Sequence, residues 1–445
     1  MPGGGGGSAA GLIPADALSL FVADAASVGM ENRREAGAKR NHRLMKRAAF
    51  LLLVLASISG CTGLGTADTG PARAGIAFDG NGEIGSWAEG LADPATGRPA
   101  TPDDPVRIAS VSKTVVAIGV MKLVDEGLLE LDRDVADYLG WRLRNPAFPA
   151  HPVTLRQLLS HTSGLRDGED AYVIPLGRSL REALEDGGPW DAAHGPGDGY
   201  FSYANFNFPV IASVIERVTG ERFDRWMRRA ILEPAGIDAC FNWPSCTDEA
   251  VSRAVVLTSG GQPIRDDLAG KRPDCPVVPD QDGGCDLERW APGENGALFS
   301  PQGGLRISAR GLARIGRLLL GGGTIDGTRV LSRRSVEEML RPAWRFNGLN
   351  GSRQGESEGI CSYGLAIRIL SSSRHCDDDP EGKRRTWLGH AGDAYGLRSG
   401  LWIDPERGVG IAYFATGLGD DPPRGKSSFS AAEERAFRRA AALLR

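Results

Sequence analysis

A long apolar stretch occupies residues 113–124, and its apolar side chains fall on nearly every face of a helix. A helix with that pattern is buried on all sides instead of lying on the surface. Gly127 marks its end. Ser110 and Lys113 stand three residues apart at its start, which places them on one face of the first turn. The pattern therefore predicts a central buried helix with a serine and a lysine side by side.

Apolar runs near both ends of the chain predict β-strands. Residues 74–78 and 84–91 form one pair of runs, and residues 397–403 and 409–415 form another around an Asp-Pro-Glu-Arg-Gly turn. Helical patterns lie between them. Strands at both ends with helices between predict an α/β (α+β) fold, in which an antiparallel sheet built from both chain ends is flanked by helices and carries a mostly helical inserted region.

Weaker patterns add further elements. Residues 363–370 form one apolar run, which predicts a single strand, and an amphipathic stripe predicts a helix over 309–320. Ser335 and Ser430 each stand three residues before a glutamate. This spacing predicts a capping box at the start of two more helices.

The N-terminal segment has the pattern of a secretion signal. Met45-Lys46-Arg47 is a short basic stretch, and residues 48–58 are an apolar run too short to span a bilayer. The run ends in Ile58-Ser59-Gly60-Cys61, which resembles the lipobox of bacterial lipoproteins, where the cysteine is lipidated and becomes the mature N-terminus. An apolar anchor without lipid is the alternative interpretation.

These features divide the chain into three parts. We expect residues 1–60 to be a lead and a lipoprotein signal peptide, with the true start at Met45, and residues 61–73 to be a linker. Residues 74–445 then form the folded domain, with a loop-rich insertion over 237–300. The expected location is the bacterial cell envelope, as a periplasmic lipoprotein anchored through Cys61, with membrane contact through the lipid alone.

Composition narrows the range of functions. The chain has 445 residues, of which 41% are hydrophobic, enough for a substantial core. Its formal net charge of −4 gives no electrostatic basis for binding nucleic acid. The oligomeric state cannot be predicted from these features.

Apart from Cys61, the cysteines fall into three local pairs in polar or Gly/Pro-rich stretches. We predict that they form three disulfide-closed loops, as in an oxidising compartment: Cys240–Cys246, Cys275–Cys285 and Cys361–Cys376. The sequence contains no C-x-x-C motif, and His375 is a single candidate ligand in an acidic loop. A metal site is therefore not expected.

The Ser110–Lys113 pair can carry nucleophilic chemistry. Desolvation and the positive end of the helix dipole both lower a lysine pKa, so the amine can accept the serine proton. The structural alternative is that Ser110 caps the helix and Lys113 extends its charge towards solvent.

Three other motifs follow along the chain. Tyr203-Ala-Asn205 precedes an apolar helical stripe, Gly303-Gly-Leu305 precedes the 309–320 pattern, and His390-Ala-Gly392 lies on a late apolar run. His161, in a His-Thr-Ser-Gly string at the end of a predicted helix, is interpreted as a structural partner of that helix end and not as a base.

The order of these motifs resembles that of the serine β-lactamase and penicillin-binding-protein superfamily. Within it, the chain is most similar to the class C β-lactamase-like serine hydrolases, in their esterase-like branch. The resemblance covers residues 74–445. It implies a sheet region beside a mostly helical region, with the active site in the groove between them, and no cofactor.

The resemblance also implies roles for individual residues. Ser110 would be the nucleophile, Lys113 its proton-accepting neighbour, and Tyr203 the general base and acid. Asn205 would orient the substrate and the lysine. The backbone N–H groups of Ser110 and Asp393 would form the oxyanion hole, a large catalytic contribution in such enzymes.

The third motif departs from the β-lactamase pattern. His390 stands where those enzymes usually carry the lysine of Lys-Thr-Gly, and Ala391 removes a hydroxyl, while Gly392 is kept as a substrate-binding position. Because a histidine is mostly neutral at pH 7, the groove loses a fixed charge for a substrate carboxylate. Esterase-like members often show a histidine here. Arg398 could replace the missing cation.

We therefore expect a cell-envelope serine hydrolase that acts on small esters or amides through an acyl-enzyme on Ser110. A D-alanyl-D-alanine carboxypeptidase or β-lactamase, acting on wall peptides or their mimics, is one alternative. A non-catalytic envelope module that binds peptide is another. The Gly355-Glu-Ser-Glu-Gly359 string matches the nucleophile motif of α/β-hydrolases, but it lies in a polar loop, whereas that motif needs a preceding strand and a following helix.

Overall fold

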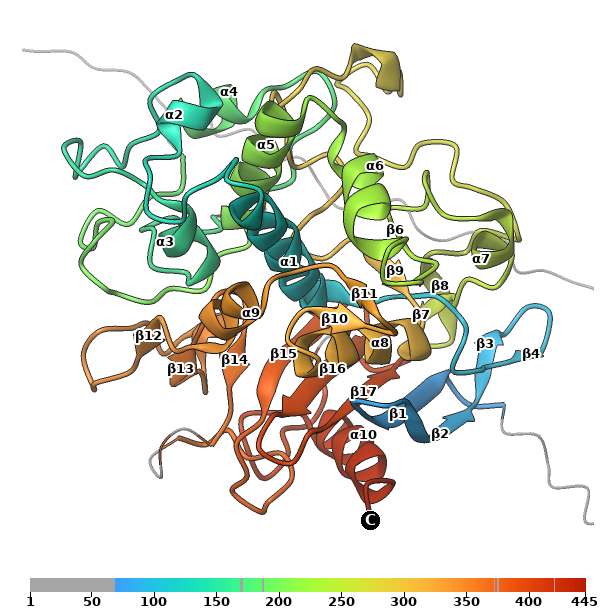
Figure 1. Ribbon diagram of the computed structural model, residues 1–445. Helices are drawn as coiled ribbons and strands as arrows, with labels where there is room; N and C mark the ends of the chain where they lie inside the picture. Colours follow the sequence, from blue (N-terminus) through green and yellow to red (C-terminus); the bar gives the residue numbers. More distant parts are fainter. Residues whose placement is uncertain (1–68, 169–170, 186–187, 372, 374–375, 420) are drawn as a thin grey trace, which may run out of the picture. The chain divides into compact units, whose positions relative to one another are not determined.

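The computed structural model describes residues 69–445, except 169–170, 186–187, 372, 374–375 and 420 (Figure 1). The predicted signal peptide and Cys61 lie outside the described residues. Within them, no helix is long and apolar enough to cross a membrane.

An eight-stranded sheet has the order β12-β13-β14-β15-β16-β17-β1-β2, and all its neighbouring strands are antiparallel. Strands from the two ends of the folded chain meet in this sheet, where β1 pairs with β17 over seven residues, from Arg73↔Ala415 to Asp79↔Val409. The predicted sheet built from both chain ends is therefore confirmed. Its strands are β1 Arg73–Asp79, β2 Glu83–Glu89, β12 Trp344–Arg345, β13 Ser362–Tyr363, β14 Arg368–Ile369, β15 Leu388–Ala394, β16 Leu397–Asp404 and β17 Val409–Ala415.

Helices cover both faces of this sheet, because successive residues of a strand point to opposite sides (Figure 1). On one face, Trp402 and Tyr413 pack against Phe437 of helix α10 (Ala431–Ala442). On the other face, Phe78 packs against helix α8 (Ala309–Leu320) so closely that a Cβ on Gly316 would lie 2.2 Å from its ring.

Helix α1 (Ser112–Asp125) is buried on all sides, as its apolar pattern predicts. It runs through the middle of the helical region and packs against α5 (Asn207–Thr219), which ends at Gly220 in a left-handed conformation. The remaining α-helices of the described residues are α2 Ala136–Leu139, α3 Leu155–Leu159, α4 Leu180–Glu185, α6 Phe223–Met227, α7 Asp248–Ser252 and α9 Arg333–Leu340.

Short strands outside the main sheet connect these regions. They are β3 Leu91–Asp93, β4 Arg98–Pro99, β5 Val106–Arg107, β6 Cys240–Phe241, β7 Leu257–Ser259, β8 Gln262–Arg265, β9 Leu305–Ile307, β10 Thr324–Ile325 and β11 Thr328–Arg329. Strand β9 lies between β5 and β6 in a three-stranded sheet. The segment before α1 is therefore hydrogen-bonded to β9, and β9 to the insertion.

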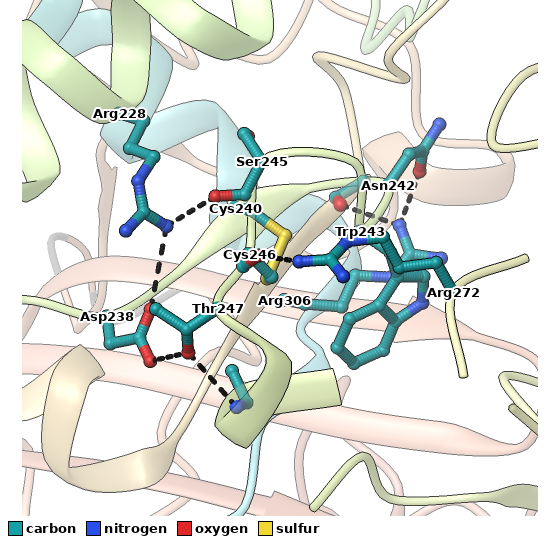
Figure 2. Close-up of a disulfide and its surroundings, with 12 residues drawn as sticks. Arg228, Asp238, Cys240, Asn242, Trp243, Ser245, Cys246, Thr247, Arg272 and Arg306 are labelled. Carbon is teal, nitrogen blue, oxygen red and sulfur yellow. Dashed lines mark hydrogen bonds and ion pairs between the residues drawn. A yellow bond between two sulfur atoms is a disulfide. The ribbon is translucent and has the colours of Figure 1, made fainter. Parts of the chain in front are cut away.

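The predicted insertion, residues 237–300, consists mostly of loops and short elements. Figure 2 shows its Cys240–Cys246 disulfide, which closes a tight turn at Asn242 and Trp243 beside Arg306 of β9. The Arg306 guanidinium contacts Asn242 and, at 2.9 Å, the Asp266 carboxylate. The predicted loops Cys275–Cys285 and Cys361–Cys376 are also disulfide-bonded.

Two local predictions were wrong. Residues 363–370 are not one strand, because the Gly364 N–H donates to the Ile367 carbonyl at 2.7 Å and the chain turns between β13 and β14. Ser335 does not cap a helix. The cap of α9 is Ser332, and the Ser335 hydroxyl donates instead to Asp125 at 2.6 Å.

Candidate active site

Ser110 lies in a 3₁₀ turn, Ala109–Val111, between β5 and α1, and Lys113 is the second residue of α1. Ala109 has a φ of +48°, a left-handed conformation that costs free energy for any residue with a side chain and that the surroundings must hold. The Ser112 hydroxyl holds Ala109 in this conformation, because it donates to the Ala109 carbonyl at 2.7 Å and accepts from the Leu305 N–H at 3.1 Å. The turn therefore has a fixed position relative to β9.

Lys113 is completely buried and makes three hydrogen bonds. Its Nζ donates to Ser110 Oγ at 2.9 Å, to Asn205 Oδ1 at 2.6 Å and to the Gln302 carbonyl at 2.9 Å. Burial lowers the pKa of Lys113 to about 8, although the carboxylates of Glu356 and Asp167 oppose this change. A small shift in pH around this value therefore converts the ammonium into an amine that can accept the Ser110 proton.

Asn205 is held in one orientation by two carboxylates. Its Nδ2 donates to Asp167 Oδ2 at 2.9 Å and to Glu356 Oε1 at 3.2 Å, so its Oδ1 faces Lys113. Asp167 is fixed in turn, because its Oδ1 accepts from the Phe206 N–H at 3.0 Å. The sequence analysis missed Asp167 and Glu356. Asp167 has no local pattern of its own, and Glu356 belongs to the Gly355–Gly359 string, which was considered only as a nucleophile motif. Both reach the site from loops far away in the sequence.

Tyr203 lies beside this pair, with Lys113 Nζ 5.0 Å from the centre of its ring. The ring stacks on His161 with centroids 4.2 Å apart. Burial raises the pKa of Tyr203 well above its usual value, while the Ser110 hydroxyl acts in the opposite direction. No described residue makes a regular hydrogen bond with the Tyr203 hydroxyl, which lines the same cleft as Ser110.

His161 supports the Tyr203–Asn205 turn. Its Nδ1 accepts from the Ala204 N–H at 3.0 Å, and Asn207 Nδ2 lies at the same distance. Burial lowers the pKa of His161 well below its usual value, so the ring is neutral. His161 therefore has a structural role, as the sequence analysis predicted, but its ring contacts residues 204–207 instead of the end of α3.

His390 is a neutral histidine with both ring nitrogens engaged. Burial, and secondly the charge of Lys113, lowers its pKa to about 3. Nδ1 lies 2.6 Å from the Ala391 carbonyl, which can only accept, so Nδ1 carries the hydrogen. Nε2 then accepts from the Tyr363 hydroxyl at 2.7 Å. His390 therefore places no positive charge in the cleft at neutral pH.

Gly392 allows β15 to approach the turn that carries Ser110. A Cβ at this position would lie 2.2 Å from the Ile108 carbonyl oxygen and 2.4 Å from Ser399 Oγ. The Ser399 hydroxyl donates to that carbonyl at 2.7 Å and links β16 to the same turn. Any larger residue would separate β15 from the turn.

Ser110 and Asp393, whose backbone N–H groups are the predicted oxyanion hole, border one cleft of about 320 Å³. The Asp393 carboxylate forms an ion pair with Arg398, whose side chain is largely buried in the wall. Arg398 therefore does reach the cleft, but with its charge paired. Among the described residues, no group of three or more His, Cys, Asp or Glu side chains is arranged to hold a metal ion.

The Gly355–Gly359 string contributes to this cleft without being a nucleophile motif. It forms a 3₁₀ turn, Gly355–Ser357, with neither a strand before it nor a helix after it. The buried Ser357 hydroxyl accepts from the Tyr203 N–H at 3.0 Å, and Glu356 lines the cleft. The loop thus supports Tyr203 and Asn205.

A serine that is hydrogen-bonded to a buried lysine, in a cleft lined by β15 of an antiparallel sheet, is the arrangement of a serine hydrolase. The chain belongs to the beta-lactamase family, whose family model matches residues 67–435. It is 30% identical over 300 residues to penicillin-binding protein 4 of Amycolatopsis lactamdurans, a match that covers 64% of this chain and 71% of that protein.

One further relative and two solved structures are also similar to the chain. The chain is 33% identical over 171 residues to esterase EstB of Burkholderia gladioli, covering 34% of this chain and 42% of that protein. A class C beta lactamase from Rhodobacter sphaeroides has a similar structure, with a TM-score of 0.59, 20% identity and coverage of 84% and 93% of the two chains. D-amino acid amidase from Ochrobactrum anthropi SV3 has a TM-score of 0.57, 22% identity and coverage of 84% and 94%.

Replacing Ser357 by alanine should weaken the site without removing its chemistry. The Tyr203 N–H would lose its acceptor, which should lower the free energy of unfolding by about 1–3 kcal/mol and misplace the Tyr203 ring. Denaturant unfolding and turnover of an aryl ester measure the two effects. Ser352→Ala in the same loop is the control and should change stability by less than about 0.5 kcal/mol. Wild-type stability and turnover in Ser357→Ala would contradict this role.

Proposed function

We propose that this protein hydrolyses small neutral esters or amides through an acyl-enzyme on Ser110. The observation that supports it most directly is the 2.9 Å hydrogen bond between Lys113 Nζ and Ser110 Oγ, with the pKa of the lysine near 8. An amine of that pKa is matched to proton transfer at near-neutral pH.

In the first half-reaction, neutral Lys113 accepts the Ser110 proton as Oγ attacks the substrate carbonyl carbon. The N–H groups of Ser110 and Asp393 stabilise the developing oxyanion. The Tyr203 hydroxyl, near both Ser110 and Lys113, passes the proton to the leaving alcohol or amine as its bond to the acyl carbon breaks. Water then attacks the ester on Ser110, and the same groups return the proton to Oγ.

The charges around Ser110 favour neutral substrates. His390 is neutral, and Arg398 is paired with Asp393. Glu356 lines the cleft as an exposed carboxyl. Neither of these two positions therefore offers an unpaired cation to a substrate carboxylate. The similarity to an esterase agrees with this choice.

A D-alanyl-D-alanine carboxypeptidase or β-lactamase is the second candidate. Two observations favour it: the similarity to a penicillin-binding protein and the presence of Arg398 in the cleft wall. The pairing of that arginine with Asp393 weakens its interaction with a substrate carboxylate, which places this function second.

We also propose that the protein works in the bacterial cell envelope as a lipoprotein anchored through Cys61. The lipobox-like string supports this location, and so do the three disulfides, because such bonds persist in oxidising compartments.

Ser110→Ala should abolish turnover, and Lys113→Ala and Tyr203→Phe should each lower kcat by about a thousandfold, as expected for groups that act as a unit.

Wild-type kcat/KM should rise with pH and level off above about pH 8, because the free base of Lys113 is the active form. Stopped assays over a pH series and intact-mass detection of an adduct on Ser110 test both statements. A protein that only binds peptide would show neither turnover nor an adduct.

The substrate proposal predicts that a short-chain aryl ester is hydrolysed far better than a chromogenic cephalosporin. Each charge-assisted hydrogen bond that His390 and Ala391 cannot supply should reduce kcat/KM for the cephalosporin by about ten- to a hundredfold. A direct comparison of kcat/KM for the two substrates is the measurement. Equal efficiency would overturn the proposal. Loss of the cephalosporin activity alone in Arg398→Ala would then identify Arg398 as the cation.

The envelope proposal predicts a lipid on Cys61 and no free thiol elsewhere in protein isolated from its bacterial host. Mass spectrometry under non-reducing conditions detects both. When a detergent solution of the protein is separated into two phases, the wild type should partition into the detergent phase. The Cys61→Ala variant should stay in the aqueous phase. Several free thiols, or equal partitioning of the two proteins, would contradict export as a lipoprotein.

A further inference from the structure

The cleft beside Ser110 has a second polar region that acyl transfer does not use. Glu433 and Phe429, at the start of α10, form part of its wall. Arg368 of β14 and Arg398 of β16 line the same region. This region is available to the part of a substrate that does not react.

Glu433 is the unusual member of this group. Its side chain is nearly inaccessible, at 4% exposure, and its Oε1 is buried without a hydrogen-bond partner among the described residues. Ser430 caps the Glu433 N–H at 3.2 Å, as predicted, and the Ser430 N–H and the Tyr413 hydroxyl both lie near the Glu433 carboxyl. A buried acceptor without a partner destabilises the protein unless a ligand donates to it.

The side chains of Gln157 and Glu434, which also lie at helix N-termini, have more hydrogen-bond partners than Glu433. In the box formed by Thr154 and Gln157, both reciprocal bonds are present. The neighbouring carboxyl of Glu434 is also fully engaged, because it accepts from the backbone and hydroxyl of Ser427 and pairs with Arg438. Glu433 therefore differs from both Gln157 and Glu434, because one of its oxygens has no such partner.

The two arginines set the charge that this region accepts. Arg368 Nη2 donates to the Gly359 carbonyl at 2.8 Å and to Ser428 Oγ at 3.2 Å, and its Nε has no partner. With Arg398 nearby, these guanidinium groups disfavour an ammonium group. The Asp393 carboxylate, which pairs with Arg398, disfavours a carboxylate. A neutral group that both donates and accepts hydrogen bonds fits the region.

The ionisation of Glu433 agrees with a neutral ligand. Burial raises the pKa of Glu433 to about 8, and the charges of Arg398 and Arg368 oppose this change. At pH 7 the carboxyl is mostly protonated, with one acceptor oxygen and one hydroxyl. This is the complement of a carboxamide, which has a carbonyl acceptor and an N–H donor.

We propose that Glu433, Arg368 and Arg398 form a subsite for a neutral carboxamide in the non-reacting part of the substrate. The amide N–H donates to Glu433, and its carbonyl accepts from the arginines. The subsite names the substrate class of the proposed hydrolase and rests on that function. It makes Glu433 a binding residue.

Matched aryl esters test this subsite. One is the ester of N-acetyl-γ-aminobutyric acid, a second is its methyl-ketone analogue without the N–H, and a third is the heptanoate. A parallel series carries the same three groups in the alcohol. Comparing each variant with wild type on the same ester cancels differences in intrinsic reactivity.

Glu433→Met keeps the length of the side chain and removes the hydrogen-bond acceptor. Glu433→Gln keeps both the length and an acceptor oxygen. In at least one series, Glu433→Met should lower kcat/KM about tenfold for the amide ester and less than about twofold for the heptanoate. Glu433→Gln should stay within about threefold of wild type on both. Equal losses on all esters in Glu433→Met, or no loss on any, would overturn the subsite.

Failure of the proposed hydrolysis can be separated from failure of the subsite. If wild type hydrolyses none of the esters, the proposed function is wrong, and calorimetry of the same esters with Ser110→Ala tests binding alone. Tighter binding of the amide ester than of the heptanoate, lost in Ser110→Ala/Glu433→Met, would support the subsite. Equal binding of the two esters would overturn it.

Discussion

The burial of Lys113 is the constraint on which the rest of the site depends. A lysine without solvent must use its donors, and this one gives them to Ser110, Asn205 and the Gln302 carbonyl. Those three partners come from the turn before α1, the turn before α5 and the loop before β9. The lysine therefore fixes three distant segments around one serine while its own pKa falls into the working range.

The insertion takes part in this arrangement from a distance. The Asn242 N–H, in the turn closed by Cys240–Cys246, donates to the Gly304 carbonyl at 3.0 Å. Gly304 follows the Gln302–Gly303 segment that accepts from Lys113. The disulfide-closed turn (Figure 2) and the buried Arg306–Asp266 pair thus stabilise the loop under the lysine. The second cysteine pair has no comparable link to the cleft in the described residues.

The sequence predicted those parts whose signals are local. The all-round apolar pattern of α1, the runs at both chain ends and the cysteine spacing each have one dominant cause, and the structure agrees with them. The prediction of a single strand over residues 363–370 was wrong, because an apolar run does not reveal the turn at Gly364. Asp167 and Glu356 were out of reach, because two carboxylates on separate loops acquire meaning only from the Asn205 amide between them.

The same cleft explains why a histidine can stand in the position of a lysine. Lys113 already places one cation beside Ser110, and a second buried cation would lower its pKa further. His390 avoids this because burial keeps it neutral, and its ring is oriented by the Ala391 carbonyl and the Tyr363 hydroxyl. Arg398 supplies positive charge from the neighbouring strand β16, where it forms an ion pair with Asp393. The cleft therefore separates a reactive end, tuned by one desolvated lysine, from a recognition end in which Arg398 is paired and Glu433 is mostly protonated at pH 7.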